Sequence, residues 1–518
     1  MGVAVDFAAG APAARPLPAR PSLAPFVLAM FGTLAAMLAM LAIDQPAGAI
    51  AMPVLLVAAY VLWKLPLKVS TLGLLGLVVL FEGLEVPLGM GWESPLYPVA
   101  RAFLTNLSAV TGIGALRAPL VDILTLGLWV MSLVRSKDKS WVSQTRSVRA
   151  LDVALGVSAA TVIGLDLLGV ARGGNMAESF WQLRHLLLFP LRCALLLRAL
   201  DGTLAELKAV AVLLIGVGVL KSLVGIYFLY GVVFPAGEYV EFTTSHTDTL
   251  LFVPLLAMFL NLLVERWSPR LFLRSMIWVP IVAFGMVCND RRLAYVCLAF
   301  AMVATFALSG RTKFKRSVIR GALFVAPFVP FYVAAGWTST GGRLFWAARL
   351  AKSVIYGDPN QGNQPDYRDL ENLNVLFTWA NNALLPYGFG HKMQVLFPLP
   401  DISTYFPSWE YHPHNQYLWI LALAGPIGFS LIFMPQVLGL YLCTRAYKAS
   451  TTLYERVAML TGIATLIAFF CQVWGDMGTL SWTVTWMAAL ACAFGAKVAL
   501  RTGAVAPPAA PRRDAFAV

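Results

Sequence analysis

Residues 411–443 read YHPHNQYLWILALAGPIGFSLIFMPQVLGLYLC, a polar segment with two histidines that leads straight into a long apolar run. A membrane-crossing helix needs about 20 mainly apolar residues, and this run is long enough. His412 and His414 are two of the five histidines in the chain. The stretch closes the longest hydrophilic segment between apolar runs, residues 337–412. It therefore predicts a membrane helix with histidines at one end.

The composition of the whole chain indicates a membrane protein. Of its 518 residues 59% are hydrophobic, and the mean hydropathy is +0.73, whereas soluble domains are about 45–50% apolar. Apolar and polar residues do not alternate within the runs, which argues against a membrane β-barrel. We predict an all-α polytopic membrane protein with about fourteen transmembrane spans, at residues 24–43, 47–63, 67–84, 118–134, 150–171, 184–200, 208–234, 248–265, 273–289, 292–309, 319–336, 414–443, 457–474 and 480–498.

The polar regions divide the chain. Residues 1–22 and 501–518 are rich in Ala and Pro and are expected to be disordered cytoplasmic arms. Residues 23–269 are expected to form an N-terminal transmembrane bundle, and residues 444–500 further transmembrane helices. One large loop outside the cytoplasm, residues 337–413, is expected between spans eleven and twelve. The first apolar run is longer than the core of a signal peptide, so we expect it to be retained as a span.

Basic residues predict the orientation. If the spans alternate, both termini lie on one face. The loops on that face carry 18 of the 39 lysines and arginines, at Lys64 and Lys68 and within 135–149, 266–274, 311–320 and 445–456. By the positive-inside rule this face is cytoplasmic, and the histidines lie outside the cytoplasm. Orientation then explains the net charge of +13, and no nucleic acid partner is expected.

Some arginines lie near the outer ends of spans, where the orientation rule does not explain them: Arg172, Arg184, Arg192, Arg291 and Arg292. Arg192 would lie about 12 Å deeper along its helix than Arg184. An arginine inside a span is costly and usually faces a polar cavity or an anion. The paired donors of a guanidinium match phosphate oxygens. We therefore predict that these arginines bind an anion.

Ion pairing is the alternative explanation for these arginines. The candidate pairs are Arg192 with Asp166, and Arg291 with Asp290 or Asp248. Lys221 also lies inside a predicted span. For this lysine we expect a structural ion pair and no contact with substrate.

His414 is the candidate general base. It lies just before a span, whose first turn would offer free N–H groups and a positive dipole end to a phosphate. Pro413 suits such a position because its missing N–H would be unpaired anyway. A histidine there can take up a proton near neutral pH. The alternative is a capping or interfacial histidine. The aromatic residues of the outer loop suit sugar rings and equally suit an interfacial belt.

No metal site is predicted. The His-x-His segment has no cluster of Cys, Asp or Glu at ligand spacing. The six cysteines all fall in apolar stretches and lack C-x-x-C spacing: Cys193, Cys288, Cys297, Cys443, Cys471 and Cys492. We expect them to be small packing residues in helices, with no disulfide framework and no zinc site.

Three segments carry a resemblance to a known family. They are His414-Asn415-Gln416-Tyr417-Leu418 followed by Gly425-Pro426-Ile427-Gly428, Asn382-Ala383-Leu384-Leu385-Pro386-Tyr387-Gly388-Phe389-Gly390, and Asp290-Arg291-Arg292. Together they resemble the O-antigen ligase and Wzy-type polysaccharide polymerase superfamily, which are membrane glycosyltransferases of the GT-C class. The resemblance covers mainly residues 270–443. The third segment departs from the family pattern, which usually has Ser-Arg followed by small residues.

The resemblance implies a substrate and a place. The donor would be a glycan on undecaprenyl diphosphate, used at the periplasmic face of the bacterial inner membrane without metal or other cofactor. His414 would be the catalytic base, and the diphosphate would be bound by Arg184, Arg192, Arg291 and Arg292. Supporting roles would fall to Asn415, His412 and Arg172. Membrane lipids and polysaccharide-assembly proteins are candidate further partners.

The acceptor stays open. A polymerase would extend another lipid-linked repeat of an exopolysaccharide or O-antigen, and this function is favoured. A ligase would transfer the glycan to lipid A–core. Two other classes remain as alternatives. A transporter or flippase of lipid-linked or anionic substrates would have charges lining mid-span positions and would not need His414. A non-catalytic membrane scaffold would need neither the arginines nor the histidines.

Overall fold

The computed structural model describes residues 57, 60–88, 91–108 and 118–505, except positions 144, 146, 241, 340–343, 346, 350, 353–366, 405 and 407. The chain divides into two compact units, and residues 65–110 and 114–518 belong to the larger one. Everything below concerns this larger unit. Its described residues form helices and no strand beyond one isolated bridge between Asn106 and Pro119.

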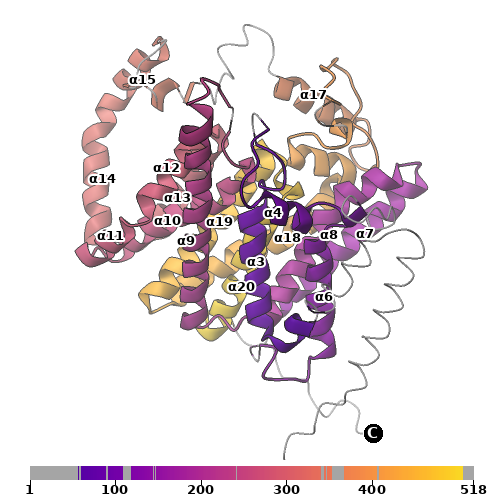
Figure 1. Ribbon diagram of the computed structural model, residues 1–518, viewed down its shortest axis with the longest axis horizontal. Coiled ribbons are helices and arrows are strands. Elements are labelled where there is room, and N and C mark those ends of the chain that lie inside the picture. Colours follow the sequence, from indigo (N-terminus) through magenta and orange to yellow (C-terminus); the bar gives the residue numbers. More distant parts are fainter. Residues whose placement is uncertain are drawn as a thin grey trace, which may run out of the picture. The chain divides into compact units, whose positions relative to one another are not determined.

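The helices of this unit are labelled in Figure 1. In chain order they are α3 (Leu67–Phe81), α4 (Tyr97–Leu104), α6 (Leu120–Val134), α7 (Arg149–Ala171), α8 (Met176–Ala199), α9 (Leu204–Tyr227), α10 (Thr249–Glu265), α11 (Pro269–Ser275), α12 (Val279–Cys288), α13 (Arg292–Leu308), α14 (Lys313–Val325), α15 (Val329–Trp337), α17 (Tyr367–Ala380), α18 (Gln416–Ala449), α19 (Leu453–Gly475) and α20 (Trp482–Arg501).

The predicted helical membrane architecture is confirmed. Within the described residues, eight helices are long and apolar enough to cross a membrane, or nine if the bent pair α11 and α12 counts as one span. Each predicted span from residue 67 onward falls on a helix, although α3, α6 and α13 are shorter than a full span. The predicted spans at 24–43 and 47–63 and both terminal arms lie almost wholly outside the described residues.

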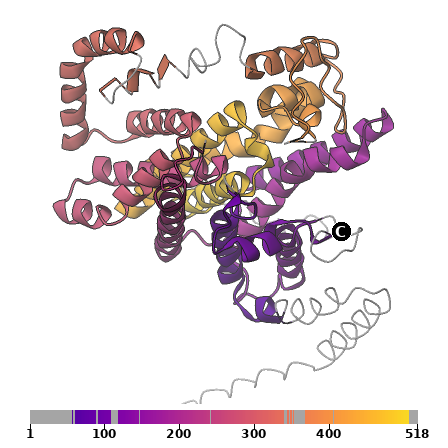
Figure 2. The same ribbon diagram turned by 45° about the horizontal axis from the view of Figure 1, so that its top comes forward.

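The core of the unit lies around α20. Of the most apolar stretch of this helix 94% is buried, against 83% for the stretch that includes α10. In Figures 1 and 2 the yellow C-terminal helices are surrounded by the others. Small residues let α18 approach α20 closely, because a Cβ added to Gly439 would lie 2.3 Å from the Cys492 sulfur. Such contacts between small residues are typical of helices packed in membranes. Five of the six cysteines are buried, as expected for packing residues.

Glycines explain two of the three sequence segments singled out above. Gly425 has a φ of +65°, which breaks α18 just before Pro426. Gly388 and Gly390 have φ values of +83° and +87°, in the left-handed region that glycine adopts without strain. Their backbone docks on two spans: Gly388 N–H donates to the Leu423 carbonyl at 2.9 Å, and the next N–H donates to the Leu165 carbonyl at 3.1 Å. This docking places the loop before His414 on α7 and α18.

The turns gather at two ends of the helices. At one end Glu82 accepts from the Trp482 and Thr483 N–H groups, at 3.1 and 2.5 Å. We call it the histidine end, and it comprises residues 82–88, 172–175, 243–248, 289–291, 412–415 and 476–481. At the other end Ser143 N–H donates to the Arg198 carbonyl at 2.7 Å. We call it the basic end, and it comprises residues 135–143, 145, 147–148, 200–203, 265–268, 309–312, 449–452 and 502–505.

Candidate functional site

His414 is held by a buried carboxylate. Its Nδ1 lies 3.0 Å from Glu371 Oε2 and 3.2 Å from Oε1. Its backbone N–H donates to the same Oε2 at 2.9 Å. The Glu371 side chain is 2% exposed, whereas the His414 side chain is 24% exposed. A carboxylate on Nδ1 fixes the ring and its tautomer, which leaves Nε2 to exchange a proton with a bound group.

Helix α17 positions Glu371. Glu371, Asn374 and Thr378 are all buried and follow at helical spacing, so they form one polar face. Asn374 Oδ1 accepts the N–H groups of Leu396 and Phe397 at 2.8 Å each. The same face thus orders the loop that follows the helix and presents Glu371 to His414.

An acidic residue and two further basic residues lie beside His414. Arg368 Nη1 donates to the Gly475 carbonyl at 3.0 Å, and His246 Nε2 lies 3.9 Å from Asp476 Oδ2. Burial by itself would raise the pKa of Asp476. The charges of His246, Arg368 and His414 and the Met477 N–H outweigh burial, so the pKa lies below its ordinary value. The pKa of Asp476 is therefore lowered because basic groups surround its carboxylate.

The arginine turn belongs to the same neighbourhood. A Cβ added to Gly475 would lie 2.7 Å from a methyl of Leu293, so the start of α13 packs against the segment that carries Asp476. Arg291 and Arg292 immediately precede that leucine. The guanidinium of Arg291 lies 4.4 Å from the centre of the Phe242 ring. The structure therefore brings the predicted arginine turn to the same end as His414.

Asp248 was one of the two acids considered as a partner of Arg291, and the structure pairs it with another residue. Asp248 pairs with Lys221, and both side chains are fully buried. Lys221 also donates to the Val79 and Glu82 carbonyls, at 3.0 and 2.6 Å. The expected structural role of Lys221 is confirmed. Because Asp248 pairs with Lys221, we no longer expect Asp248 to pair with Arg291.

Arg184 and Arg192 share one carboxylate. Arg184 Nε lies 2.6 Å from Asp122 Oδ2, and Arg192 Nη2 lies 3.3 Å from Asp122 Oδ1. Trp482 Nε1 donates to the same Oδ1 at 3.0 Å. The alternative partner considered for Arg192 was wrong, because Asp166 instead accepts from the Ser179 hydroxyl. Glu82 is a second negative charge near both arginines, so two carboxylates balance the two guanidinium groups.

Arg184 and Arg192 differ in the side chains and spaces that surround them. Arg192 is fully buried and contacts His185 and Thr485. Arg184 lies 4.6 Å from the centre of the Trp482 ring and lines an apolar groove of about 650 Å³ between α6, α7 and α8. Its Nη2 has no hydrogen-bond partner within the described part of the chain. Arg184 is 3% exposed and borders this groove, whereas Arg192 is fully buried and does not line it.

His412, Asn415 and Arg172, the predicted supporting residues, are all held by contacts within the protein. His412 is 5% exposed, and burial lowers its pKa to about 4, so its ring is neutral at pH 7. The Asn415 side chain accepts the Leu418 N–H at 3.2 Å and caps α18. Arg172 Nη1 donates to the Pro386 carbonyl at 2.5 Å. Because Asn415 occupies one free N–H, the first turn of α18 is in part already capped.

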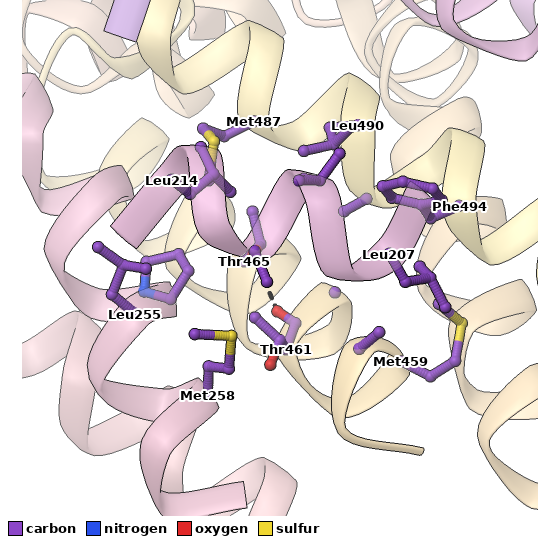
Figure 3. Close-up of a pocket in the computed structure, with 16 residues that line it drawn as sticks. Leu207, Leu214, Leu255, Met258, Met459, Thr461, Thr465, Met487, Leu490 and Phe494 are labelled. Carbon is purple, nitrogen blue, oxygen red and sulfur yellow. Dashed lines mark hydrogen bonds between the residues drawn. The ribbon is translucent and has the colours of Figure 1, made fainter. Parts of the chain in front are cut away.

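A small cavity, shown in Figure 3, lies among α9, α10, α19 and α20. It encloses about 80 Å³. The only polar side chains that line it are Thr461 and Thr465, and the Thr465 hydroxyl donates to the Thr461 carbonyl at 2.8 Å. Without a charged group on its wall, this cavity is not a candidate for catalysis.

Sequence reasoning missed Glu371 and Asp476 and gave Arg368 no role. The signal that could have found Glu371 is the spacing of Glu371, Asn374 and Thr378, which places polar residues on one face of a helix. The surrounding region was instead read as one hydrophilic loop. Asp476 carries no such local signal, because its neighbours come from distant parts of the chain.

Among the described residues, no group of three or more His, Cys, Asp or Glu side chains is arranged to hold a metal ion. No protein-family model matches the chain, and no curated protein matches its sequence. The function therefore has to be argued from the side chains at the histidine end.

Proposed function

We propose that this protein is a glycosyltransferase of the bacterial inner membrane that acts at the periplasmic face. It takes a glycan from undecaprenyl diphosphate and transfers it to an acceptor hydroxyl, polymerising the repeat units of an exopolysaccharide or O-antigen. One observation carries the proposal: an imidazole, His414, is held on Nδ1 by the buried Glu371 carboxylate at the start of a membrane-length helix.

The proton transfer follows from this pair. The anomeric carbon forms a bond to the acceptor oxygen and breaks its bond to the diphosphate oxygen. His414 Nε2 takes the proton of the acceptor hydroxyl. Glu371 keeps the ring oriented and stabilises the imidazolium that forms, as a carboxylate does for a catalytic histidine. The bond electrons leave with the diphosphate.

Basic groups would bind the leaving diphosphate. Negative charge grows on it as the bond breaks, and fixed cations stabilise such charge strongly in a site that excludes water. Arg368 is one candidate, since it donates to the Gly475 carbonyl beside Asp476. Arg291 and Arg292 are further candidates, since they precede Leu293, which packs against Gly475. Arg184 is a candidate for the lipid-facing side, because it lines the apolar groove. Arg192 would act through Asp122.

The acceptor decides between polymerase and ligase. A cell without a polymerase caps its glycans with single repeat units. A cell without a ligase accumulates long lipid-linked chains. Deletion of the gene followed by analysis of the lipid-linked and surface glycans separates the two. We expect single-unit caps.

Movement of lipid-linked substrates is the second candidate function. The observation that favours it is the apolar groove along α6, α7 and α8, with Arg184 on its wall. A groove that faces lipid and carries a charge suits an amphiphile that moves along it. This function would not require the contact between His414 and Glu371.

Reconstitution tests the proposal. The purified full-length protein is placed in liposomes with an undecaprenyl-diphosphate-linked glycan, and extension of the glycan is followed by mass spectrometry. A general base contributes about 10²–10⁴ in rate, so we expect His414→Ala to lose at least about a hundredfold. Glu410→Gln is the matched control, because this loop carboxylate pairs with Lys392, whereas His414 pairs with Glu371.

Full transfer activity in His414→Ala would refute the assigned site. A wild-type protein that transfers no glycan but moves the lipid between leaflets would favour the second candidate.

A further inference from the structure

A polar cavity of about 430 Å³ lies at the basic end, between the last turns of α6 and α8 and the start of α7. One side of it is apolar, with Trp129, Leu133 and Leu197. The polar residues that line it are Ser136, Ser143, Thr145, Ser147, Asp152 and Arg198. This cavity belongs to the opposite end of the helices from His414, and the proposed glycan transfer makes no use of it.

The wall of the cavity is fixed by hydrogen bonds. The hydroxyls of Ser143 and Thr145 both donate to Asp201, the latter at 2.9 Å. Lys497 Nζ donates to Ser143 Oγ at 3.0 Å and to the Thr145 carbonyl at 2.5 Å. Lys497 is itself 1% exposed. These hydrogen bonds therefore hold the wall of the cavity in place.

One cation and one anion line the cavity. Arg198 donates through Nη2 to the Ser132 carbonyl at 2.6 Å, and its buried Nε has no hydrogen-bond partner within the described part of the chain. Asp152 lies in the first turn of α7 and is exposed. A ligand that carries both signs of charge would match this pair.

The cavity continues into an apolar groove. Trp129, Asp152 and Ala194 line both the polar cavity and the groove of about 650 Å³ between α6, α7 and α8. Along α8 the rise from Arg198 to Arg184 is about 21 Å. One leaflet of a bilayer has a hydrocarbon thickness of about 15 Å, half of the full core. The groove is thus long enough for the acyl chain of a lipid whose head occupies the cavity.

We propose that the cavity and groove together bind one zwitterionic aminophospholipid. The phosphate would contact Arg198, the primary ammonium would contact Asp152, and one acyl chain would lie in the groove. A lipid with an anionic head and no ammonium would place its phosphate near the Asp152 carboxylate without compensation. A choline head has no N–H to donate to this carboxylate. The pair of charges therefore selects an ethanolamine head.

Titration of the delipidated full-length protein tests this proposal. Dioleoyl phosphatidylethanolamine, phosphatidylcholine and phosphatidylglycerol are added separately in detergent, and bound lipid is counted by native mass spectrometry. An ion pair of about 1 kcal/mol corresponds to about fivefold in affinity, so we expect the first bound phosphatidylethanolamine to bind about fivefold more tightly than the other lipids. Asp152→Asn should reduce this preference to less than about twofold.

Two further variants separate a lost contact from a lost fold. Arg198→Lys keeps the positive charge and should retain the preference for ethanolamine, whereas Arg198→Gln should weaken binding of all three lipids. Lys137→Gln removes an exposed charge of the neighbouring loop that does not line the cavity, and should change nothing. Equal binding of the three lipids by the wild type would overturn the proposal. So would an ethanolamine preference that survives in a folded Asp152→Asn protein.

Discussion

Some carboxylates at the two ends of the helices differ in the number of basic groups around them. Two carboxylates at the basic end each pair with one arginine: Arg456 Nε lies 2.6 Å from Glu265, and Arg501 Nη2 lies 2.6 Å from Glu455. Two other carboxylates, toward the histidine end, each meet several basic groups. Asp122 lies between two arginines, and Asp476 lies in the field of two histidines and an arginine. A one-to-one pair joins two side chains, whereas a shared carboxylate holds several basic groups together.

His412 and His414 lie two positions apart and differ in burial and in partner. His412 is buried, and its pKa of about 4 keeps it neutral. His414 is partly exposed and contacts Glu371. Burial thus assigns one histidine to packing, and a carboxylate partner assigns the other to proton transfer. Their spacing in the sequence could not have separated these roles.

Removal of a shared carboxylate is expected to have the largest effect. Asp122→Asn removes the carboxylate that contacts two buried guanidinium groups, and breaking a buried pair costs about 3–5 kcal/mol. Glu455→Gln at the basic end is the control. Its partner Arg501 is 34% exposed, so we expect a loss of about 1 kcal/mol or less. Thermal unfolding in detergent measures both. Equal losses would mean that the two ends do not differ.

The second prediction concerns pH. The pKa of His412 falls from 6.5 to about 4 on folding, so the unfolded chain binds a proton that the folded protein excludes. The stabilisation is complete above pH 6.5 and is lost as the pH falls toward 4, by up to about 3 kcal/mol. His412→Phe should make stability less dependent on pH in this window. Unfolding curves at pH 7, 6 and 5 provide the test. An unchanged slope in the variant would contradict the assignment.

The third prediction compares one arginine from each end. Arg368→Gln removes a cation beside His414 but keeps a hydrogen-bond donor for the Gly475 carbonyl. We expect glycan transfer to fall about tenfold or more, because the growing charge on the diphosphate loses a counter-charge. Arg501→Gln at the basic end should leave the transfer rate unchanged. Similar rates for the two variants would remove Arg368 from the site.

The sequence predicted the parts of this protein that depend on local pattern. Hydropathy located the described helices from α3 onward except α4 and α17, because the length of an apolar run is a local property. The Gly388 and Gly390 segment marked a real feature, the docking of the loop before His414 on α7 and α18. His414 and the arginine turn lie at the same end of the helices.

The partners of these residues could not be predicted, because they depend on packing between distant segments. Asp122 precedes Arg184 by 62 positions and Arg192 by 70. Glu371 lies 43 positions before His414, on a helix within a region that was read as a loop. Polar residues at helical spacing pointed to that helix. Only the fold determines which carboxylate each base meets.

The central claim is that His414 and Glu371 act as one unit in glycan transfer. The most direct test is a double-mutant cycle of His414→Ala, Glu371→Gln and both together, with single-turnover transfer in liposomes as the readout. Residues that act as a unit are strongly non-additive, so the double variant should be no slower than His414→Ala alone. If the two losses multiply instead, Glu371 acts independently of His414, and the proposed site is wrong.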